Sequence, residues 1–384
     1  TKRAPKVRFK GFTDAWEQRK LGELVDVCSG RDYKHLSEGD IPVYGTGGYM
    51  LSVSEALSYD KDAIGIGRKG TIDKPYILNA PFWTVDTLFY AIPKEKVDLN
   101  FAFDIFQNIN WKKKDESTGV PSLSRTAINE IHILVPQYDE QQVLGQLFYG
   151  IDRLIALHQR KLDKMKELKK AFLNLIFSQK LRFYGFTDSW ELRKLEEVAP
   201  LRGGYAFQSN QYANEGIPIV RISNILSDGS VGGEFVFHNE LKDDEIFMLE
   251  NGDIVLAMSG ATTGKVSILS SEKSCKYYQN QRVGLFSKTA TCNYSFVATI
   301  VRSEKFLEQL RDVLVAGAQP NVSAKDIDAF DFSVPKDVEE QSQIGNFFRT
   351  LDRLITLYQK KIDSSKEMKK ILLKNMLILS LIHI

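Results

Sequence analysis

The sequence predicts an α+β protein: two mixed α/β domains with much strand, separated by two long helices packed as an antiparallel coiled coil in a pseudo-twofold arrangement. Two repeated strings predict this plan. RFKGFTDAWEQRKL at residues 8–21 returns as RFYGFTDSWELRKL at 182–195, with eleven of fourteen positions identical. IDRLIALHQRKLDKMKELKK at 151–170 returns as LDRLITLYQKKIDSSKEMKK at 351–370, with twelve of twenty identical. The chain therefore consists of two copies of one plan.

The repeats divide the chain into four segments. We expect globular domains at residues 1–140 and 181–340, a long helix at 141–180, and a second helix with a tail at 341–384. The repeated beginnings lie 174 residues apart and the repeated endings 200 apart, so the second copy carries 26 more residues between them.

Apolar residues recur at alternating spacings of three and four in both helical segments, as expected for an amphipathic helix. The first stripe consists of Leu144, Leu147, Ile151, Leu154, Met165, Leu168, Phe172 and Leu175, widened by Phe148, Ile155, Leu162 and Ile176. Neither helix can bury its stripe alone, and a twofold relation would make the pair antiparallel. His158 and Tyr358 fall at matching positions, where we expect a polar edge of the seam; the alternative is a functional role for His158. Residues 141–180 carry eight basic and three acidic side chains, which indicates a solvated face or a DNA-facing one.

Short apolar runs separated by Gly, Asn, Pro and Asp fill the rest of each copy, and they predict strands joined by tight turns. Short helices are expected at FAFDIFQNI and SEKFLEQLRDVL. Both domains close with a related phrase, VPSLSRTAINEIHILVP at 120–136 and QPNVSAKDIDAFDFSVP at 319–335. A repeated frame around different contents suggests one task performed on two different targets.

Bulk composition limits the class of protein. The chain has 384 residues, 43% of them hydrophobic, and its 51 basic residues almost balance its 49 acidic ones, so any DNA-binding surface must be local. Three scattered cysteines form neither a metal spacing nor a disulfide framework, which is typical of a cytoplasmic protein. The apolar tail MLILSLIHI is too short to span a bilayer, and we expect no membrane association.

Several strings imitate catalytic motifs and fail on inspection. Gly65, Gly67 and Gly70 match a dinucleotide-binding pattern, but Pro75 stops the helix that this motif requires. SGATTGKV has one residue too few between its glycines for a phosphate-binding loop. Asn79 to Phe82 resembles the adenine-binding string of DNA amino-methyltransferases, without a convincing cofactor loop upstream. We therefore expect no catalytic residues, no cofactor and no metal in this chain.

Polar loops near glycines remain as candidate binding residues. Arg and Lys suit guanine, Asn and Gln suit adenine, and the Thr methyl suits thymine, while exposed glycines let the backbone approach phosphate. The candidates for contact with DNA are Tyr44, Thr46, Gly47, Tyr49, Arg68, Lys69, Thr71, Ser122 and Ser124 in the first domain and Arg221, Ser223, Asn224, Ser259, Thr262, Thr263, Lys265, Gln279, Asn280, Gln281, Arg282, Gln319 and Asn321 in the second.

The RF-x-GFTD-x-W-x-x-RKL opening and the DRLI-x-L-x-Q-[RK]-K helix, each present twice, resemble the specificity (S) subunit of type I restriction–modification systems. IPVYGTGG, IGRKGTIDKP and FWTVDTLFY in the first half, and EGIPIVRISNI, SGATTGK and AQPNVSAKDI in the second, add to the resemblance, which covers essentially the whole chain.

The resemblance implies that residues 1–140 and 181–340 are target recognition domains, each reading one half of a bipartite, asymmetric DNA site, and that the helices are spacers. It implies double-stranded DNA, two methyltransferase (M) subunits and restriction (R) subunits as partners. S-adenosylmethionine would bind the M subunits, and ATP and Mg²⁺ the R subunits, so this chain is expected to be non-catalytic. The alternatives are a self-contained DNA adenine methyltransferase, or a coiled-coil scaffold that does not bind DNA.

Overall fold

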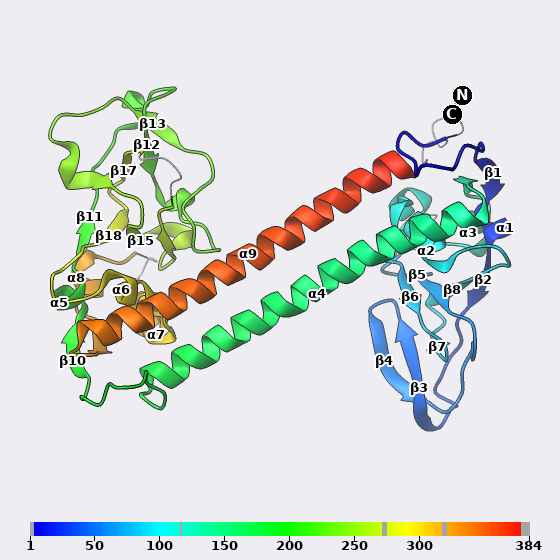
Figure 1. Cartoon of the computed structure of the whole chain (residues 1–384), viewed down its shortest axis with the longest axis horizontal. Helices are drawn as coiled ribbons and strands as arrows, with labels where there is room; N and C mark the ends of the chain where they lie inside the picture. The colour runs from blue at the N-terminus through cyan, green and yellow to red at the C-terminus, as the bar shows by residue number, and fades with distance from the viewer. Residues whose placement is uncertain (1–3, 116, 271–274, 317–320, 378–384) are drawn as a thin grey trace. The chain divides into compact units, whose positions relative to one another are not determined.

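The computed structural model describes residues 4–115, 117–270, 275–316 and 321–377 (Figure 1). The chain divides into two compact units: residues 1–162 with 358–384, and residues 163–357. Gln319 and the tail beyond Leu377 lie outside the described residues. Within the described ranges, no helix is both long enough and apolar enough to cross a bilayer.

Two sheets and a two-stranded ribbon build the first unit. An antiparallel sheet in the order β2-β8-β5-β6 is formed by β2 (Val25–Ser29), β8 (Leu88–Pro93), β5 (Ala63–Gly67) and β6 (Tyr76–Leu78). A second sheet, β4-β3-β7, is formed by β4 (Gly48–Val53), β3 (Glu38–Gly45) and β7 (Trp83–Thr84), with β3 and β7 parallel. β1 (Glu17–Lys20) pairs antiparallel with β9 (His132–Val135), so the first repeated string meets the closing phrase.

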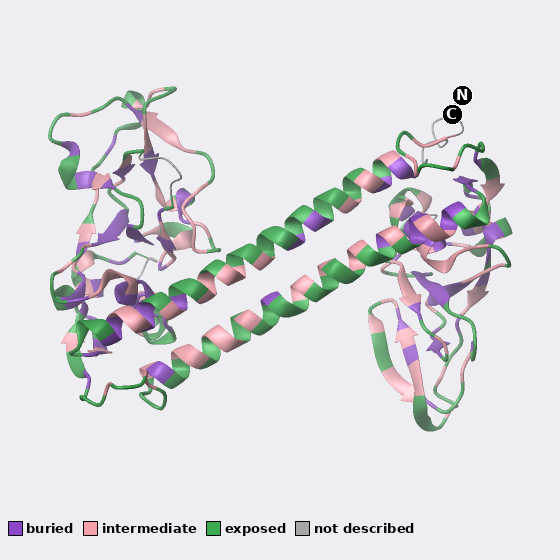
Figure 2. Ribbon diagram, in the orientation of Figure 1, coloured by how far each residue is buried: buried purple, intermediate pink, exposed green. Residues whose placement is uncertain are grey.

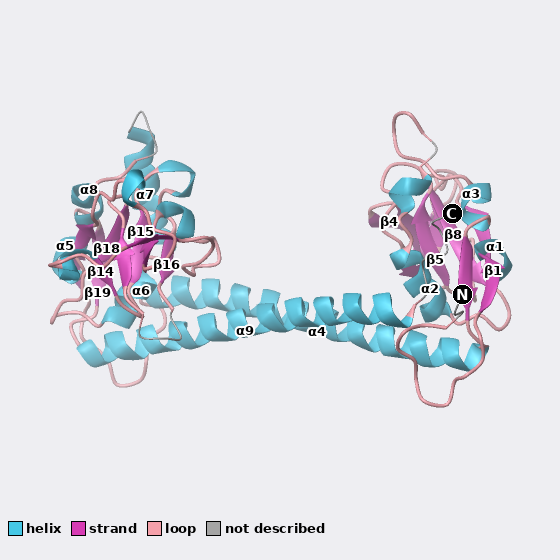
Figure 3. Ribbon diagram, turned by 90° about the horizontal axis from the view of Figure 1, so that it is seen from above, coloured by secondary structure: helices cyan, strands magenta, loops and turns pink. Residues whose placement is uncertain are grey.

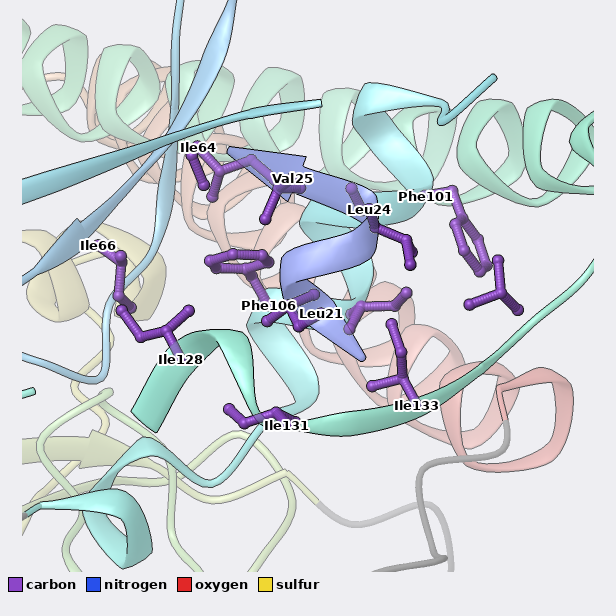
Figure 4. Close-up of a cluster of buried hydrophobic side chains, with 14 of the residues drawn as sticks. Leu21, Leu24, Val25, Ile64, Ile66, Phe101, Phe106, Ile128, Ile131 and Ile133 are labelled. Carbon is purple, nitrogen blue, oxygen red and sulfur yellow. The ribbon is translucent and has the colours of Figure 1, made fainter. Parts of the chain in front are cut away.

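Helices cover the first of these sheets and complete the core of the first unit. They are α1 (Leu21–Leu24), α2 (Leu99–Asn108), the 3₁₀ helix η1 (Trp111–Lys114), α3 (Arg125–Asn129), the first part of α4 (Tyr138–Phe177) and the last part of α9 (Val338–Met376). Leu21, Ile64, Phe106 and Ile133 come from four different elements and meet in one buried cluster (Figure 4). Leu373, Met376 and Leu377 pack into the same cluster, so the end of α9 is part of this core.

The second unit has sheets of the same kind (Figure 3). One is ordered β11-β18-β15-β16, the other β13-β12-β17-β14, and β10 pairs with β19. The strands are β10 (Glu191–Lys194), β11 (Leu201–Gly203), β12 (Ile217–Val220), β13 (Val236–His238), β14 (Met248–Leu249), β15 (Ile254–Ala257), β16 (Val266–Ile268), β17 (Tyr277–Gln279), β18 (Val283–Phe286) and β19 (Asp331–Val334). The helices are α5 (Leu195–Val198), η2 (Ser209–Gln211), η3 (Ile222–Asn224), η4 (Asp244–Phe247), η5 (Gly260–Thr262), α6 (Tyr294–Ile300), α7 (Glu304–Ala316) and α8 (Ala324–Asp328), with parts of α4 and α9.

The two units share a strand topology that their dissimilar central sequences do not reveal. The order β2-β8-β5-β6 in one corresponds to β11-β18-β15-β16 in the other, and the parallel pair β3–β7 corresponds to β12–β17. The largest difference lies in one connection. Residues 46–47 join β3 to β4, whereas residues 221–235 join β12 to β13. Much of the 26-residue excess of the second copy therefore lies in this one loop.

Segments of α4 and α9 pack against each other within each unit, as the sequence predicts. In the first unit Asp152 contacts Lys369 and His158 contacts Tyr358, with their ring centroids 5.9 Å apart. In the second unit Phe172 contacts Phe347, with 5.2 Å between ring centroids. The residue numbers of the partners on α9 decrease as those on α4 increase, so the paired segments are antiparallel.

The buried side of α4 is narrower than the predicted stripe (Figure 2). Phe148, Leu162 and Ile176, which were expected only to widen the stripe, are at most 2% exposed. Leu154 and Leu175, which were expected to belong to the stripe itself, are 42% and 40% exposed. The prediction was wrong at these two positions because several stripes of similar spacing can be drawn through so apolar a helix, and the partner surface selects one.

Candidate nucleic-acid interface

Backbone hydrogen bonds hold four loops of the first unit together. Arg68 N–H donates to the Thr87 carbonyl (2.8 Å), and Leu123 N–H donates to the Arg68 carbonyl (2.9 Å). Arg31 N–H donates to the Thr84 carbonyl (2.9 Å). We call residues 30–31, 68–70, 84–87 and 121–123 loop cluster 1.

The second unit repeats these bonds with different side chains. Met258 N–H donates to the Arg282 carbonyl (3.0 Å), Val322 N–H to the Met258 carbonyl (3.0 Å), and Tyr205 N–H to the Gln279 carbonyl (2.9 Å). Residues 204–205, 258–260, 279–282 and 321–322 are loop cluster 2. The two clusters therefore have one backbone framework and separate side-chain contents.

A glycine makes the close approach possible in each cluster. A Cβ atom on Gly30 would lie 2.0 Å from the Val85 carbonyl oxygen, and one on Gly204 would lie 2.3 Å from the Gln279 carbonyl oxygen. Any side chain there would push apart the loops that the backbone bonds join. The requirement is the same in both units although the following residue is Arg31 in one and Tyr205 in the other.

Arg31, Arg68 and Lys69 are exposed cations of loop cluster 1. The Arg68 side chain lies above the ring of Phe89, with 5.7 Å between its Cζ atom and the ring centroid, and its Nη1 donates to the Asp86 carbonyl at 3.4 Å. Lys69 forms an isolated antiparallel bridge with Ser122. The following Thr71 is half-buried. The guanidinium of Arg68 keeps most of its donors available on a fixed backbone.

The β3–β4 hairpin carries four more of the predicted residues. Thr46 and Gly47 form its turn, and Tyr49 is 63% exposed with its ring centroid 6.4 Å from that of Tyr44. Val85 N–H donates to the Tyr44 carbonyl (3.0 Å), which attaches this hairpin to loop cluster 1. An open hollow of about 510 Å³ lies at this junction, lined by Asp32, Tyr33, Lys34, Met50, Val85 and Asp86.

Loop cluster 2 exposes a different set. Gln281, Arg282 and Asn321 are exposed, and Ser259 and Asn280 are half-buried. Near them, the β12–β13 connection and η5 are joined by two side chains. Lys265 Nζ donates to Ser227 Oγ (2.8 Å), and Thr262 Oγ1 donates to the Ile222 carbonyl (3.3 Å).

Thr263 Oγ1 donates to the Gly260 carbonyl at 2.7 Å, within the η5 turn. In the β12–β13 connection itself, Ser223 is exposed and Arg221 is half-buried.

Three predicted residues serve the fold rather than the surface. Asn224 is 1% exposed, and its side-chain amide donates to the Gly232 and Glu234 carbonyls. Gln279 is fully buried and donates to the Arg202 and Val283 carbonyls. Ser124 Oγ accepts the Ala127 N–H as the N-cap of α3. The reason is the same in each case: a polar side chain that meets buried backbone groups is needed there to satisfy them.

The sequence did not single out several residues that the structure brings to the two clusters. Arg31 and Asp86 join loop cluster 1, and Tyr205 joins loop cluster 2. The one available signal was a glycine followed by a bulky polar residue, directly after β2 in the first unit and after β11 in the second. Lys112, Lys113 and Lys114 in η1 were also missed, although three consecutive lysines are visible in the sequence.

Hydrogen bonds to carboxylates fix the loops beside cluster 1. The pKa of Asp115 is lowered by the backbone N–H of Ser122, then by the N–H and hydroxyl of Ser117. A hydrogen bond from Lys112 lowers the pKa of Asp73. Both carboxylates therefore stay ionised at neutral pH and act as structural acceptors.

The strings that imitate enzyme motifs belong to hairpins or to the core. Gly65 and Gly67 lie in the fully buried β5, which continues into a hairpin loop. Phe82, which would have to stack on a flipped adenine, is fully buried against Tyr90. Among the residues described, no group of three His, Cys, Asp or Glu side chains has a metal-binding arrangement.

Comparisons with known proteins agree with this two-unit plan. A family model described as "Type I restriction modification DNA specificity domain" matches residues 13–167 and again residues 187–365. The chain is 24% identical over 277 residues to the "Type I restriction enzyme MjaVIII specificity subunit" of Methanocaldococcus jannaschii, an alignment that covers 67% of this chain and 64% of that protein. It is 24% identical over 230 residues to the EcoAI specificity subunit of Escherichia coli, covering 58% of this chain and 38% of that protein. These alignments span less than two thirds of either relative.

A solved structure gives the same fold at low sequence identity. The crystal structure of a type I restriction–modification S subunit from M. genitalium matches with a TM-score of 0.75 and 15% identity, covering 98% of this chain and 99% of that one.

Proposed function

Since this chain belongs to the family of type I restriction–modification DNA specificity proteins, we propose that it recognises DNA on behalf of a methyltransferase and restriction complex. In this proposal the first unit reads one half of a bipartite, asymmetric site and the second unit reads the other half. The chain itself has no catalytic role.

The observation that carries the proposal is the pair of loop clusters. One backbone framework occurs twice, held by the bonds of Arg68 and of Met258, and it carries different exposed side chains each time. Arg68 and Lys69 in one cluster, and Gln281, Arg282 and Asn321 in the other, have the donors and acceptors that distinguish base edges in the major groove. Two unlike readers on one scaffold suit a target with two unlike halves.

We further propose that α4 and α9 set the distance between the half-sites and provide docking surfaces for two M subunits, with R subunits joining that complex. S-adenosylmethionine would be bound by the M subunits, and ATP with Mg²⁺ by the R subunits. Because its ligand is double-stranded DNA and its partners use ATP, we place the chain in the cytoplasm.

Base-modification sequencing tests the proposal. DNA would be taken from cells that express this chain alone, its partner methyltransferase alone, or both. We expect methylated adenine in a two-part motif only when both are present. Methylation by this chain alone, in cells without a compatible M subunit, would overturn the non-catalytic assignment. No motif with both proteins present and assembled would overturn DNA recognition.

A further inference from the structure

The 3₁₀ helix η1 holds three consecutive lysines on a rigid base. Trp111 is 2% exposed, and its Nε1 donates to the Phe106 carbonyl at 2.7 Å. The side chain of Asn110 caps the helix by accepting the Lys113 N–H at 3.3 Å. The backbone of Lys112, Lys113 and Lys114 is therefore fixed by a buried anchor before the segment and a cap at its start.

Two contacts attach η1 to the loops that present loop cluster 1. Lys112 Nζ lies 2.9 Å from the carboxylate of Asp73, in the loop that begins with Arg68. Asp115, directly after η1, accepts the Ser122 N–H at 2.9 Å, and Ser122 forms the bridge with Lys69. The lysines and loop cluster 1 consequently belong to one framework in the first unit.

The charge of these lysines is only partly balanced. Lys112 is paired with Asp73. Lys113, which is exposed, and Lys114, which is half-buried, have no acidic partner within the described ranges. Two adjacent cations that form no ion pair with any described residue, on a backbone fixed beside a loop cluster, suit the closely spaced negative charges of a DNA backbone.

The second unit has a different structure at the corresponding place in the chain. There α7, thirteen residues long, follows α6 and carries both acidic and basic side chains. At this position, among the residues that the structure describes, only the first unit has the run of three lysines.

We propose that Lys113 and Lys114 bind backbone phosphates of DNA beside the half-site read by loop cluster 1, and that they contribute affinity without sequence preference. This inference rests on the proposed function and adds a site to it. Phosphate contacts release counterions, so each one makes binding more sensitive to salt, whereas base contacts define the motif.

The test uses the full chain in complex with its methyltransferase and a fluorescent duplex of mixed sequence, titrated over a series of salt concentrations. The slope of log K against log salt concentration should become less steep by about 1.8 in the Lys113→Ala/Lys114→Ala variant, because each phosphate contact contributes about 0.9. Lys113→Arg/Lys114→Arg should keep the wild-type slope, since the charge is retained. Lys6→Ala/Lys10→Ala, which removes the same charge from the N-terminal segment, should also leave the slope unchanged.

Base-modification sequencing of the same variants separates this inference from the proposed function. We expect the complex that contains the alanine variant to methylate the wild-type motif, with less efficient methylation at high salt. An unchanged slope with an intact motif would disprove the phosphate site and leave DNA recognition standing. An altered motif would show that the lysines read bases, which also contradicts the proposal. If the wild-type complex gave no motif, the proposed function itself would fail.

Discussion

Arg8 donates two hydrogen bonds, from Nε and Nη2, to the carboxylate of Glu140 at 2.6 and 2.7 Å. Trp16 Nε1 donates to the same carboxylate at 3.2 Å. Glu140 lies in the first turn of α4 and is 1% exposed. The repeated string is thereby explained: its arginine and tryptophan fasten the start of the domain to the start of the long helix. Arg182 and Trp190 do the same with Glu340 in the second unit.

Removing Glu140 should destabilise the first unit strongly. Glu140→Ala leaves a largely buried guanidinium and an indole N–H unpaired, and we expect a loss of about 3 kcal/mol in the free energy of unfolding. Urea unfolding of the complex-free chain measures this loss. Glu23→Ala breaks only the exposed pair with Arg19 and should cost about 0.5 kcal/mol or less. Equal effects of the two substitutions would contradict the role given to Glu140.

Single substitutions in the two loop clusters should affect different halves of the motif. We expect Arg68→Ala to relax recognition of one half-site by about 1–3 kcal/mol, and Arg282→Ala to relax the other, because each would lose contacts to one base pair. Base-modification sequencing with the methyltransferase partner reports both halves at once. Loss of both halves from either substitution, or failure of the complex to assemble, would count against base reading by that residue.

Exchanging the central part of the second recognition domain should change only one half-site of the DNA motif. The central part of residues 196–340 would be replaced by that of a relative with a different target, leaving β10, β19 and the long helices α4 and α9 unchanged. We expect a hybrid motif with the original first half and a new second half. An unchanged motif would refute the division of recognition between the units. The matched control replaces the same part with a synonymous copy of itself.

The two-copy plan and the paired long helices could be predicted because the sequence patterns that mark them have only one structural interpretation. A string that returns with its arginine, tryptophan and RKL ending intact marks a second beginning, and the helix stripes mark the pairing of α4 with α9. The contents of the domains could not be predicted in the same way. β5 and β15 occupy equivalent places in sheets of the same order, but their sequences share only an apolar run, and the pairings that define the order are long-range.

The sequence predicted candidate binding residues without separating surface residues from buried ones. Polar residues near glycines led to Arg68 and Arg282, which the structure places in the two loop clusters. The same residue types gave Asn224 and Gln279, whose amides point inward to satisfy backbone carbonyls. Composition cannot separate the two cases, because an amide that bonds to a base and one that bonds to a buried carbonyl have the same chemistry.

A buried carboxyl in α2 gives the first unit a pH dependence that the equivalent position of α6 cannot give the second unit. Asp104 in α2 is 2% exposed and lies 4.0 Å from Lys369, which is itself paired with Asp152. Burial raises the pKa of Asp104 from 3.8 to about 8, opposed by Lys369 and assisted by Asp152 and Asp98. Thr299 stands at the equivalent place in α6, six residues after its N-cap as Asp104 is after Asp98.

The sign of the effect follows from the proton balance. Between about pH 4 and pH 8 the folded unit keeps a proton that the unfolded chain releases, so stability falls as pH rises through this range. At its steepest the loss is about 1.4 kcal/mol per pH unit. Asp104→Asn should remove this slope, as measured by urea unfolding at several pH values, while Asp40→Asn, an exposed control, should not. A slope that persists in Asp104→Asn would assign the effect to another group.

The two units close in the same way at their long helices. Val7 N–H donates to the Asn375 carbonyl at 3.0 Å, and Leu181 N–H donates to the Leu175 carbonyl at 3.1 Å. Val7 and Leu181 occupy equivalent positions, directly before the two repeated opening strings. Leu175 and Asn375 occupy equivalent positions, after the two repeated helix strings. In the first unit the segment before β1 is hydrogen-bonded to the end of α9. In the second unit the linker before β10 is hydrogen-bonded to the end of α4 in the same way.

A circular permutant tests this equivalence. Residue 377 would be joined to residue 4 by a short glycine linker, and the chain opened between Ser178 and Gln179. Because every helix, strand and core contact is kept, we expect normal assembly with the methyltransferase and an unchanged methylated motif. A permutant opened between His158 and Gln159 interrupts α4 and should not assemble. The control is the chain cyclised by the same linker but not opened. If this cyclised chain assembles and gives the motif while the chain opened after Ser178 does not, then the linker after α4 has a role that the segment before β1 cannot replace.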